Sequence, residues 1–380
     1  MPDLGVAIIG FGFIGKVHAH AYRSLPLFYD PPPAACRLVG VCTARQETAA
    51  KAKQQGGFEV CTTDFRELIA REDVHIVNVC TPNDLHKPVV LAALEAGKHV
   101  YCDKPLALNL AEAREIAAAA RQSAVTHQMT FHMRFIPALM RASQLVEQGF
   151  LGRVFHFRMA YLHCGYADAD RPLSWRLTKA RAGAGALGDL GSHAIDLTRH
   201  LLGEIAAVNA HTETFIGDRP RERGARERVP VEVDDYCLIR ARLAQGGVGT
   251  IEASRYATGT DDDMVFEIYG EKGALRFNLM QPNYLEVFDE TDPGGELGGS
   301  RGFKRLATVQ HYPPPSVLPS SKLPVGWMRF HISCLHSFLS HVAAGEPAAP
   351  DLIEGARTQA VMQAALESSA SGQWQEVEDV

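Results

Sequence analysis

The stretch Val6-Ala7-Ile8-Ile9-Gly10-Phe11-Gly12-Phe13-Ile14-Gly15 decides the fold. Four apolar residues run directly into a G-x-G-x-x-G pattern, as expected for a strand that is buried on both faces and turns sharply into a helix. Gly10 would allow the tight turn, Gly12 would let the backbone approach a pyrophosphate, and Gly15 would let the helix pack close to the strand. We therefore expect a dinucleotide-binding turn, with the helix N-terminus facing the phosphates.

The residues that follow alternate between strand-like and helix-like patterns. Buried strands are expected at residues 38–42, 75–80 and 100–102, and helices at residues 46–55, 84–96 and 109–122. Strands joined by crossover helices predict an α/β fold with a doubly wound parallel sheet. Ligands of such sheets bind beyond the carboxyl ends of the strands, where this sequence has Gly10, Thr43, Pro82 and Lys104.

The pattern changes near residue 128. A series of strand-like runs without intervening helices is typical of a mostly antiparallel sheet, and these runs fall at residues 206–215, 236–243, 248–256, 265–269, 274–278 and 284–288, with an earlier strand at 154–162. Helices are expected at residues 137–148, 189–202, 328–342 and 352–371, and a long irregular segment at 292–324. We therefore predict a Rossmann domain over residues 1–127 and an α+β domain, built on a large open sheet, over residues 128–380.

The composition excludes several classes of protein. A chain of 380 residues with 46% hydrophobic and 22% charged residues is typical of a soluble globular protein with two domains. The formal charge of -6 argues against a nucleic acid or an anionic membrane as partner. The eight cysteines form no C-x-x-C pair, no apolar run is long enough to span a membrane, and the first strand leaves no room for a signal peptide. We therefore expect a cytoplasmic protein with reduced thiols.

Five motifs, in order along the chain, resemble those of one family. They are the fingerprint at residues 10–15, Thr81-Pro82-Asn83 with His86, Asp103-Lys104-Pro105, Trp175-Arg176, and Gly188-Asp189-Leu190-Gly191-Ser192-His193-Ala194-Ile195-Asp196. In these motifs the chain is similar to the glucose-fructose oxidoreductase, inositol dehydrogenase and rhizopine-catabolism (Gfo/Idh/MocA) family. The resemblance implies a Rossmann domain joined to an open-sheet domain, and transfer of a hydride between NAD(P) and a hydroxyl-bearing carbon of a sugar, glycoside or inositol. It also implies that Lys104, Asp189 and His193 are catalytic.

These three residues also suit the chemistry of alcohol oxidation, which needs one group to take the hydroxyl proton and another to stabilise the developing alkoxide. Lys104 would lie at the carboxyl end of a strand, with its ammonium near the reacting oxygen. Asp189 and His193 are four residues apart, so on a helix they share one face and the carboxylate would bias the tautomer and basicity of the imidazole. We expect His193 to be the base and Lys104 its electrostatic partner, although these roles could be reversed or shared. In an arbitrary sequence, Asp189 would be a helix cap and His193 a surface residue.

Further residues are candidates for ligand binding. For the cofactor they are Gly10, Phe11, Gly12, Phe13, Ile14, Gly15, Thr43, Arg45, Thr81, Pro82, Asn83, His86, Asp103, Lys104, Trp175 and Arg176. For the substrate, His132 and Arg134 join Lys104, Asp189 and His193. His132 stands where the family often has Asn, and Arg134 could instead support the domain junction. Other histidines have no partners at metal-ligand spacing, so we predict no metal site.

The second predicted strand ends in Cys42-Thr43-Ala44-Arg45, without a carboxylate to bind the 2′-hydroxyl of the NAD ribose. Thr43 and Arg45 would instead hold the 2′-phosphate of NADP, so we expect NAD or NADP, with NADP favoured. An uncovered face of the second sheet would be buried in a homodimer or homotetramer. Two other functions fit the same motifs: an NAD-retaining glycosidase of this fold, and a non-catalytic cofactor-sensing protein.

Overall fold

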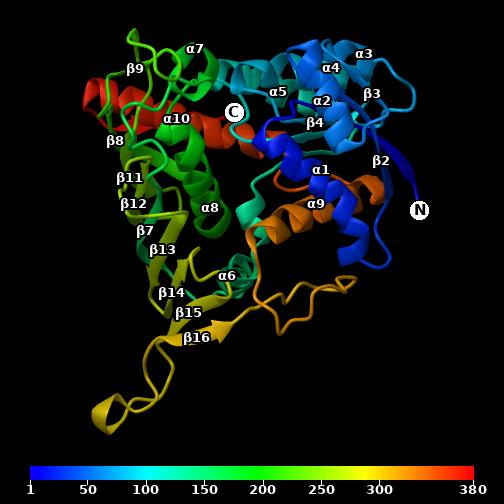
Figure 1. Ribbon diagram of the computed structural model, residues 1–380. Coiled ribbons are helices and arrows are strands. Elements are labelled where there is room, and N and C mark those ends of the chain that lie inside the picture. The colour runs from blue at the N-terminus through cyan, green and yellow to red at the C-terminus, as the bar shows by residue number, and fades with distance from the viewer.

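The first sheet is built around β1 (Asp3–Ile9), which is buried along its whole length after Asp3. The computed structural model describes residues 1–380, and β1 lies inside a six-stranded sheet (Figure 1). The strand order is β3-β2-β1-β4-β5-β6, and every pair is parallel. The other strands are β2 (Ala35–Cys42), β3 (Val60–Thr62), β4 (Ile76–Val79), β5 (His99–Cys102) and β6 (His127–Met129). The predicted doubly wound parallel sheet is thus confirmed.

Crossover helices pack against both faces of this sheet, and a separate apolar cluster fills each interface. The helices are α1 (Phe13–Phe28), α2 (Gln46–Gly56), α3 (Phe65–Ile69), α4 (His86–Glu95) and α5 (Leu110–Gln122). The start of α5 follows from the sequence, because the Asn109 side chain accepts a hydrogen bond of 3.0 Å from the Glu112 amide.

The second sheet has nine strands, in the order β16-β15-β14-β13-β7-β12-β11-β8-β17. Only β7 and β12 run parallel, so the prediction of a mostly antiparallel sheet is also confirmed. Its strands are β7 (Val154–Leu162), β8 (Ile205–Glu213), β11 (Tyr236–Leu243), β12 (Val248–Ser254), β13 (Asp263–Gly270), β14 (Gly273–Asn278), β15 (Tyr284–Asp289), β16 (Lys304–Ala307) and β17 (Gln375–Glu376). A separate hairpin pairs β9 (Asp218–Pro220) with β10 (Arg228–Pro230).

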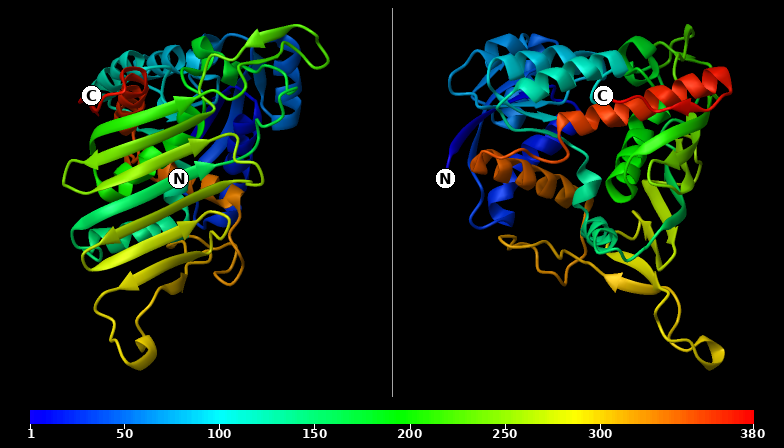
Figure 2. Two further views of the ribbon diagram at one scale, coloured as in Figure 1. Left: turned by 90° about the vertical axis from the view of Figure 1, so that its left-hand side faces the viewer. Right: turned by 180° about the vertical axis from the view of Figure 1, so that it is seen from behind.

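One face of the nine-stranded sheet is apolar and the other is polar, because side chains alternate along each strand. Phe157, Ile239 and Phe266 belong to a core that α6 (Pro137–Glu147), α8 (Ser192–Leu202) and α10 (Leu352–Ser371) complete. On β7, His156 and Arg158 alternate with these inward residues and are exposed. Figure 2 (left) shows that no helix covers this outer face.

The last two long helices return to the first sheet. α9 (Trp327–Ala344) packs against α1, and its Leu335 and Phe338 join the core beneath β1. α10 begins in the core of the first sheet with Leu352 and ends in the core of the second with Ala365. A boundary at residue 127 would cut through β6, and α9 packs with the first domain, although it follows the second in sequence. No helix in the chain combines the length and the apolar character needed to cross a membrane.

The segment expected to be irregular, residues 292–324, contains one strand, β16, and the parts before and after this strand run in different directions. Residues 290–303 form an arm between β15 and β16 that projects from the body (Figure 1, lower left). Residues 308–324 run back to α1, where the Val317 amide donates to the Phe28 carbonyl at 2.9 Å. The sequence did not predict β3, β6, β9, β10, β16 and β17. These strands have two to four residues, and none contains three apolar residues, as the equally short β4 and β5 do.

Candidate active site

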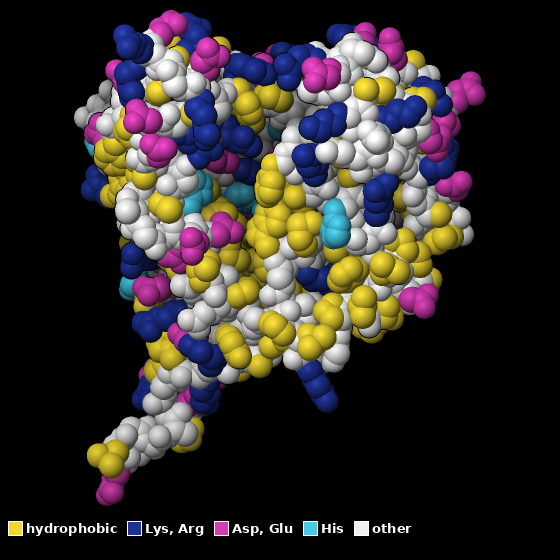
Figure 3. Space-filling view, in the orientation of Figure 1, with side chains coloured by type: hydrophobic (Ala, Val, Ile, Leu, Met, Phe, Trp, Pro, Cys, Tyr) yellow, Lys and Arg dark blue, Asp and Glu magenta, His cyan; other side chains and the backbone are white.

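The carboxyl ends of β1, β2, β4 and β5 open on a cavity of about 770 Å³, which we call the first cavity. A second cavity of about 560 Å³ adjoins it between the two sheets. The two form one cleft, because they share the wall residues Phe13, Ile14, Asp103, Lys104, Arg176 and Asp189. Figure 3 shows histidine side chains inside the hollow between the two layers.

The three fingerprint glycines have three different physical roles. Gly10 has a φ of 95°, and a Cβ there would lie 2.4 Å from the Cys80 carbonyl oxygen. A Cβ on Gly15 would lie 2.2 Å from the Gly10 carbonyl oxygen, so Gly15 serves the packing of α1 on β1 and does not line the cavity. Gly12 has nothing within 4 Å of its Cβ position and opens on the first cavity at the start of α1. This cradle fits a dinucleotide phosphate.

Most of the other predicted cofactor residues line the first cavity: Phe11, Phe13, Ile14, Thr43, Thr81, Pro82, Asn83, Asp103, Lys104, Trp175 and Arg176. Trp175 and Arg176 lie on the short turn η3 (Trp175–Leu177), and the guanidinium carbon of Arg176 lies 4.4 Å from the Trp175 ring centre. Both side chains are half-buried. They close the cavity from the side of the second sheet.

Besides Gly15, two predicted cofactor residues do not reach the cavity wall. His86 is fully buried behind it, and its ring nitrogens lie 3.0 Å from the Thr81 carbonyl and 2.9 Å from the Pro105 carbonyl. It therefore supports the backbone of two wall segments. Arg45 is exposed and does not line the cavity, and its carbonyl accepts hydrogen bonds from the Thr43 and Thr48 hydroxyls. At this end of the cavity the wall includes Asp64 and Arg66.

Asp189 lies between two cations. It belongs to a π-helical turn, η4 (Leu187–Gly191), directly before α8. The Lys104 ammonium donates to the Asp189 carboxylate at 3.0 Å and to its carbonyl at 2.8 Å, and the Arg255 guanidinium donates to the other carboxylate oxygen at 3.2 Å. The expectation that this carboxylate sets the tautomer of His193 is wrong, because its two oxygens bind Lys104 and Arg255 and the His193 Nδ1 has no hydrogen-bond partner. Its charge does act on the basicity of His193: burial lowers the pKa of that imidazole, and the carboxylate raises it.

The charges in this cluster follow from burial and from the neighbouring groups. Burial alone would raise the pKa of Asp189, but Lys104, Arg255 and Arg176 hold that pKa well below its ordinary value, so the carboxylate stays ionised. Burial lowers the pKa of His193 well below its ordinary value, and the Lys104 cation lowers it further. His193 is therefore a neutral imidazole, which can accept a proton from a ligand in the second cavity.

His132, expected in the substrate site, lines the second cavity on the turn η2 (His132–Phe135). Its ring centre lies 5.1 Å from that of His193 and 4.0 Å from that of the buried His331, on which it stacks. His18 continues this row, 5.9 Å beyond His331. The four histidines make no metal site, since no group of three potential ligands is arranged around one point.

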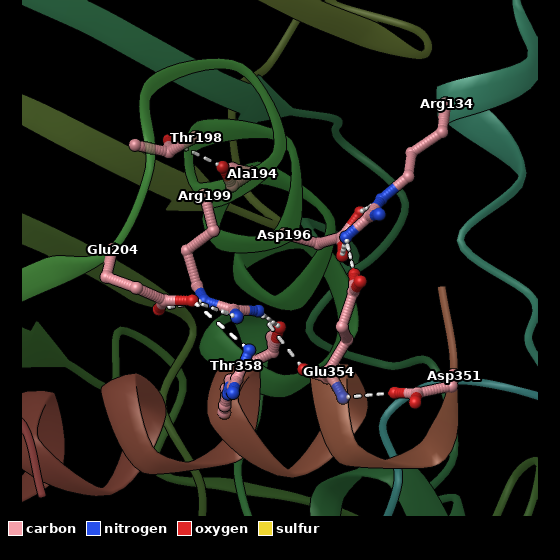
Figure 4. A network of polar contacts seen from close by, with 10 residues as sticks. Arg134, Ala194, Asp196, Thr198, Arg199, Glu204, Asp351, Glu354 and Thr358 are labelled. Atoms are coloured by element: carbon pink, nitrogen blue, oxygen red, sulfur yellow. Dashed lines mark hydrogen bonds and ion pairs between the residues drawn. The ribbon is translucent and has the colours of Figure 1, made fainter. Parts of the chain in front are cut away.

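Arg134, also expected to bind substrate, is turned away from the cleft. Its guanidinium forms two bonds, of 2.9 and 2.6 Å, with the Asp196 carboxylate of α8, and contacts Glu354 of α10 at 2.6 Å (Figure 4). Burial by itself would lower the pKa of Arg134, but the two carboxylates raise it above its ordinary value. Removing one member of such a buried pair costs about 3–5 kcal/mol. Arg134 thus supports the junction between the two domains, which was the alternative role that the sequence suggested for it.

The same network fixes α8 at a second point. Arg199 donates twice to Glu204 at 2.9 Å and once to the Thr358 hydroxyl of α10 at 3.0 Å (Figure 4). Asp196 and Arg199 lie one turn apart on α8 and hold it against α10 and η2, and His193 lies one turn before Asp196. The position of His193 in the cleft therefore depends on ion pairs that lie outside both cavities.

Sequence reasoning missed several residues of the cleft. Arg255 was read as the end of a strand, and Asp64 follows a strand too short to recognise. In the second cavity the missed residues are Tyr161, His163, Leu190, Asp262, Leu279, Met280, Pro282, Trp327 and Phe330. They come from five separate segments. The available signal was a polar residue directly after a recognisable strand, and of the two only Arg255 shows it.

Comparison with known proteins agrees with the fold and with the cleft. Residues 4–131 match the family model described as oxidoreductase family, NAD-binding Rossmann fold, and residues 139–276 match the GFO/IDH/MocA C-terminal domain. The chain is 36% identical to levoglucosan dehydrogenase of Pseudarthrobacter phenanthrenivorans, over 100% of both chains. It is 26% identical to myo-inositol 2-dehydrogenase of Thermotoga maritima, over 90% of each. A structure of levoglucosan dehydrogenase with NADH and levoglucosan superposes with a TM-score of 0.94, at 37% identity over 100% of both chains.

The buried histidines predict a loss of stability in acid. Burial lowers the pKa of His132 to about 3, and also lowers the pKa values of His18, His193 and His331. Below pH 6.5 the unfolded chain binds protons that the folded chain excludes. The free energy of unfolding therefore decreases as the pH is lowered, by up to about 1.4 kcal/mol per pH unit for each histidine. Urea denaturation between pH 7 and 5 should show a shallower decline for His331→Leu. His211→Leu, at an exposed site, should follow the wild type; parallel curves for His331→Leu and wild type would contradict the assignment.

Proposed function

This chain belongs to the GFO/IDH/MocA family of NAD-binding oxidoreductases, and we propose that it oxidises a ring hydroxyl of an uncharged sugar, glycoside or inositol. An anhydro sugar of the levoglucosan type is the first candidate, because the relative of that name is similar over the full length of both chains. The observation that carries the proposal is the junction of the two cavities. Lys104 and Asp189 line both of them, and His193 lines the second.

The residues that would hold the cofactor are Gly10 and Gly12 at the phosphates, Thr43 at the ribose end, and Trp175 with Arg176 near the second cavity. When bound, the nicotinamide ring supplies the site that accepts or returns a hydride. The chain's own residues manage the proton. Neutral His193 takes it from the reacting hydroxyl, and the Lys104 ammonium hydrogen-bonds the oxygen as negative charge develops there.

Asp189 has a supporting role in this scheme. Its carboxylate holds the Lys104 ammonium in place, while Arg255 binds the other oxygen and keeps it turned toward Lys104. Asp189 therefore acts on Lys104 rather than on His193.

We also propose a cytoplasmic location. All eight cysteines are free thiols, five of them buried, and a reducing compartment would keep them so.

The direct test of the activity is a panel of anhydro sugars, glycosides, hexoses and inositols, each supplied with NAD and with NADP. Nicotinamide absorbance should rise with repeated turnover for at least one sugar. Bound cofactor with no net reduction, together with cleavage of a glycoside, would support the glycosidase instead. Cofactor binding with neither reaction would support a sensor.

Substitution of the two proton-handling residues should affect turnover far more than cofactor binding. Lys104→Met and His193→Ala should each lower kcat by roughly 10²- to 10⁴-fold. The fold-loss in kcat of the double variant should be much smaller than the product of the two single fold-losses, because both residues serve one proton transfer. The rising limb of the pH profile of kcat/KM should disappear in His193→Ala. The exposed Lys51→Met and His20→Ala are matched controls. If His193→Ala kept the wild-type kcat and rising limb, Lys104 would be the base.

We propose NAD as the working cofactor, which reverses the sequence-based preference for NADP. That preference rested on Thr43 and Arg45 and on the lack of a carboxylate after the second strand. Thr43 lines the cavity but Arg45 does not, whereas the Asp64 carboxylate does and would repel a 2′-phosphate. Arg66 lies beside it, 3.6 Å from that carboxylate. Asp64→Ser keeps a good helix cap for α3 and should raise the NADP-to-NAD ratio of kcat/KM about tenfold. Arg45→Ala should leave that ratio unchanged. The opposite pattern in the two variants would restore Arg45 as the ribose-end determinant.

We propose that the outer face of the nine-stranded sheet joins two or more copies of the chain. This face carries charges of both signs, and Arg158 stands directly opposite Glu267 on the neighbouring strand. Two copies related by a twofold axis could therefore match unlike charges. Sedimentation at micromolar concentration should show a dimer or tetramer, and Arg158→Glu, which sets two carboxylates side by side, should weaken it. A wild-type monomer at that concentration would rule the interface out.

A further inference from the structure

The second cavity holds a carboxylate that no cation neutralises. Asp262 lies at the end of the turn between β12 and β13, is half-buried, and lines the cavity. Its Oδ1 accepts a hydrogen bond of 2.6 Å from the Tyr161 hydroxyl. Unlike Asp189, it takes part in no ion pair. The second carboxylate oxygen, Oδ2, is left for a ligand.

Tyr161 fixes this carboxylate relative to His193. It lies on β7 and is 6% exposed, and its ring meets that of His193 edge to face at 5.8 Å between centres. Burial, together with Asp262, raises the pKa of Tyr161 well above its ordinary value. The hydroxyl therefore stays protonated and donates a hydrogen bond to Asp262. One side chain thus sets the distance between the proton acceptor, His193, and Asp262.

Much of the remaining wall of the second cavity is apolar. This apolar part includes Phe13, Leu279, Met280, Pro282, Trp327 and Phe330. Phe13 and Met280 are 71% and 53% exposed, and Phe13 packs against Trp327 with ring centres 5.7 Å apart. A sugar ring has the matching character, with hydroxyls on one side and C–H groups on the other. The hydroxyls would face Asp262, Asp189 and Lys104, and the C–H groups would cover the apolar wall.

We propose that Asp262, positioned by Tyr161, binds the substrate hydroxyls remote from the reacting carbon and selects uncharged sugars against sugar acids and sugar phosphates. An ionised carboxylate accepts hydrogen bonds from hydroxyls more strongly than a neutral acceptor does. It also repels a second anion in a cleft that excludes much of the water. This inference rests on the proposed function and assigns the determinant of specificity within the same site.

The test is the affinity for an uncharged sugar, first measured by calorimetry on the protein with bound NADH and then as KM. Asp262→Asn should weaken the sugar's affinity and raise KM about 10- to 100-fold, with kcat changed less than about threefold. Tyr161→Phe should raise KM by a smaller factor, because the carboxylate remains but is no longer held. Asp261→Asn, at the exposed neighbouring position, is the matched control and should behave as wild type.

Two further readouts separate a binding role from a structural one. A deoxy sugar that lacks the bound hydroxyl should bind wild type weakly, and Asp262→Asn should weaken it little further. Discrimination against the corresponding sugar acid should fall in Asp262→Asn. Equal sugar affinity in Asp262→Asn, Asp261→Asn and wild type would overturn the inference, even if the wild type oxidises the sugar. Sugar binding without any oxidation would instead count against the proposed function, while the affinities still test Asp262.

Discussion

The bridge that Asp189 makes between Lys104 and Arg255 is the interaction on which the cleft depends. Lys104 follows β5 of the first sheet, whereas Asp189 and Arg255 belong to the second layer, so the ion pair crosses the interface between the two. Arg255 is 1% exposed and Lys104 is largely buried. Two cations this close, without a carboxylate between them, would repel each other in a poorly solvated site. The π-helical turn before α8 brings the Asp189 carbonyl and carboxylate to the same lysine.

Behind this bridge, ion pairs outside the two cavities hold the helix that carries His193. Arg134 and Arg199 fasten α8 to η2 and α10, and α10 continues from the core of one sheet into the core of the other. α9 returns to the face of the first sheet that carries α1 and completes its core. The two layers are therefore joined both by apolar packing and by buried ion pairs, and the site at their junction inherits its geometry from both.

The sequence predicted most of the fold because long elements display their own periods. The strands β7 and β11 and the helix α10 have the predicted limits, and the fingerprint glycines stand where a backbone needs them. It could not show where a helix packs: α9 has an apolar face that suits either sheet. Nor could it show pairing across the cleft. Asp189 was assigned to His193 by its spacing in sequence, but its partners Lys104 and Arg255 are remote in sequence. Asp64 was overlooked because it follows a three-residue strand that the sequence does not reveal, whereas Arg45 follows a longer, apolar one.

We propose that Asp189 serves the oxidation through Lys104 and that the glycine turn binds the phosphates independently of it. Asp189→Asn tests it most directly, because the carboxamide keeps the shape and one hydrogen-bond acceptor but removes the charge between two buried cations. The measurement is the single-turnover rate of nicotinamide reduction at saturating sugar, with cofactor affinity determined on the same preparation. We expect a rate lower by about 10²-fold or more and a cofactor affinity within about threefold of wild type. A wild-type rate in Asp189→Asn would contradict it.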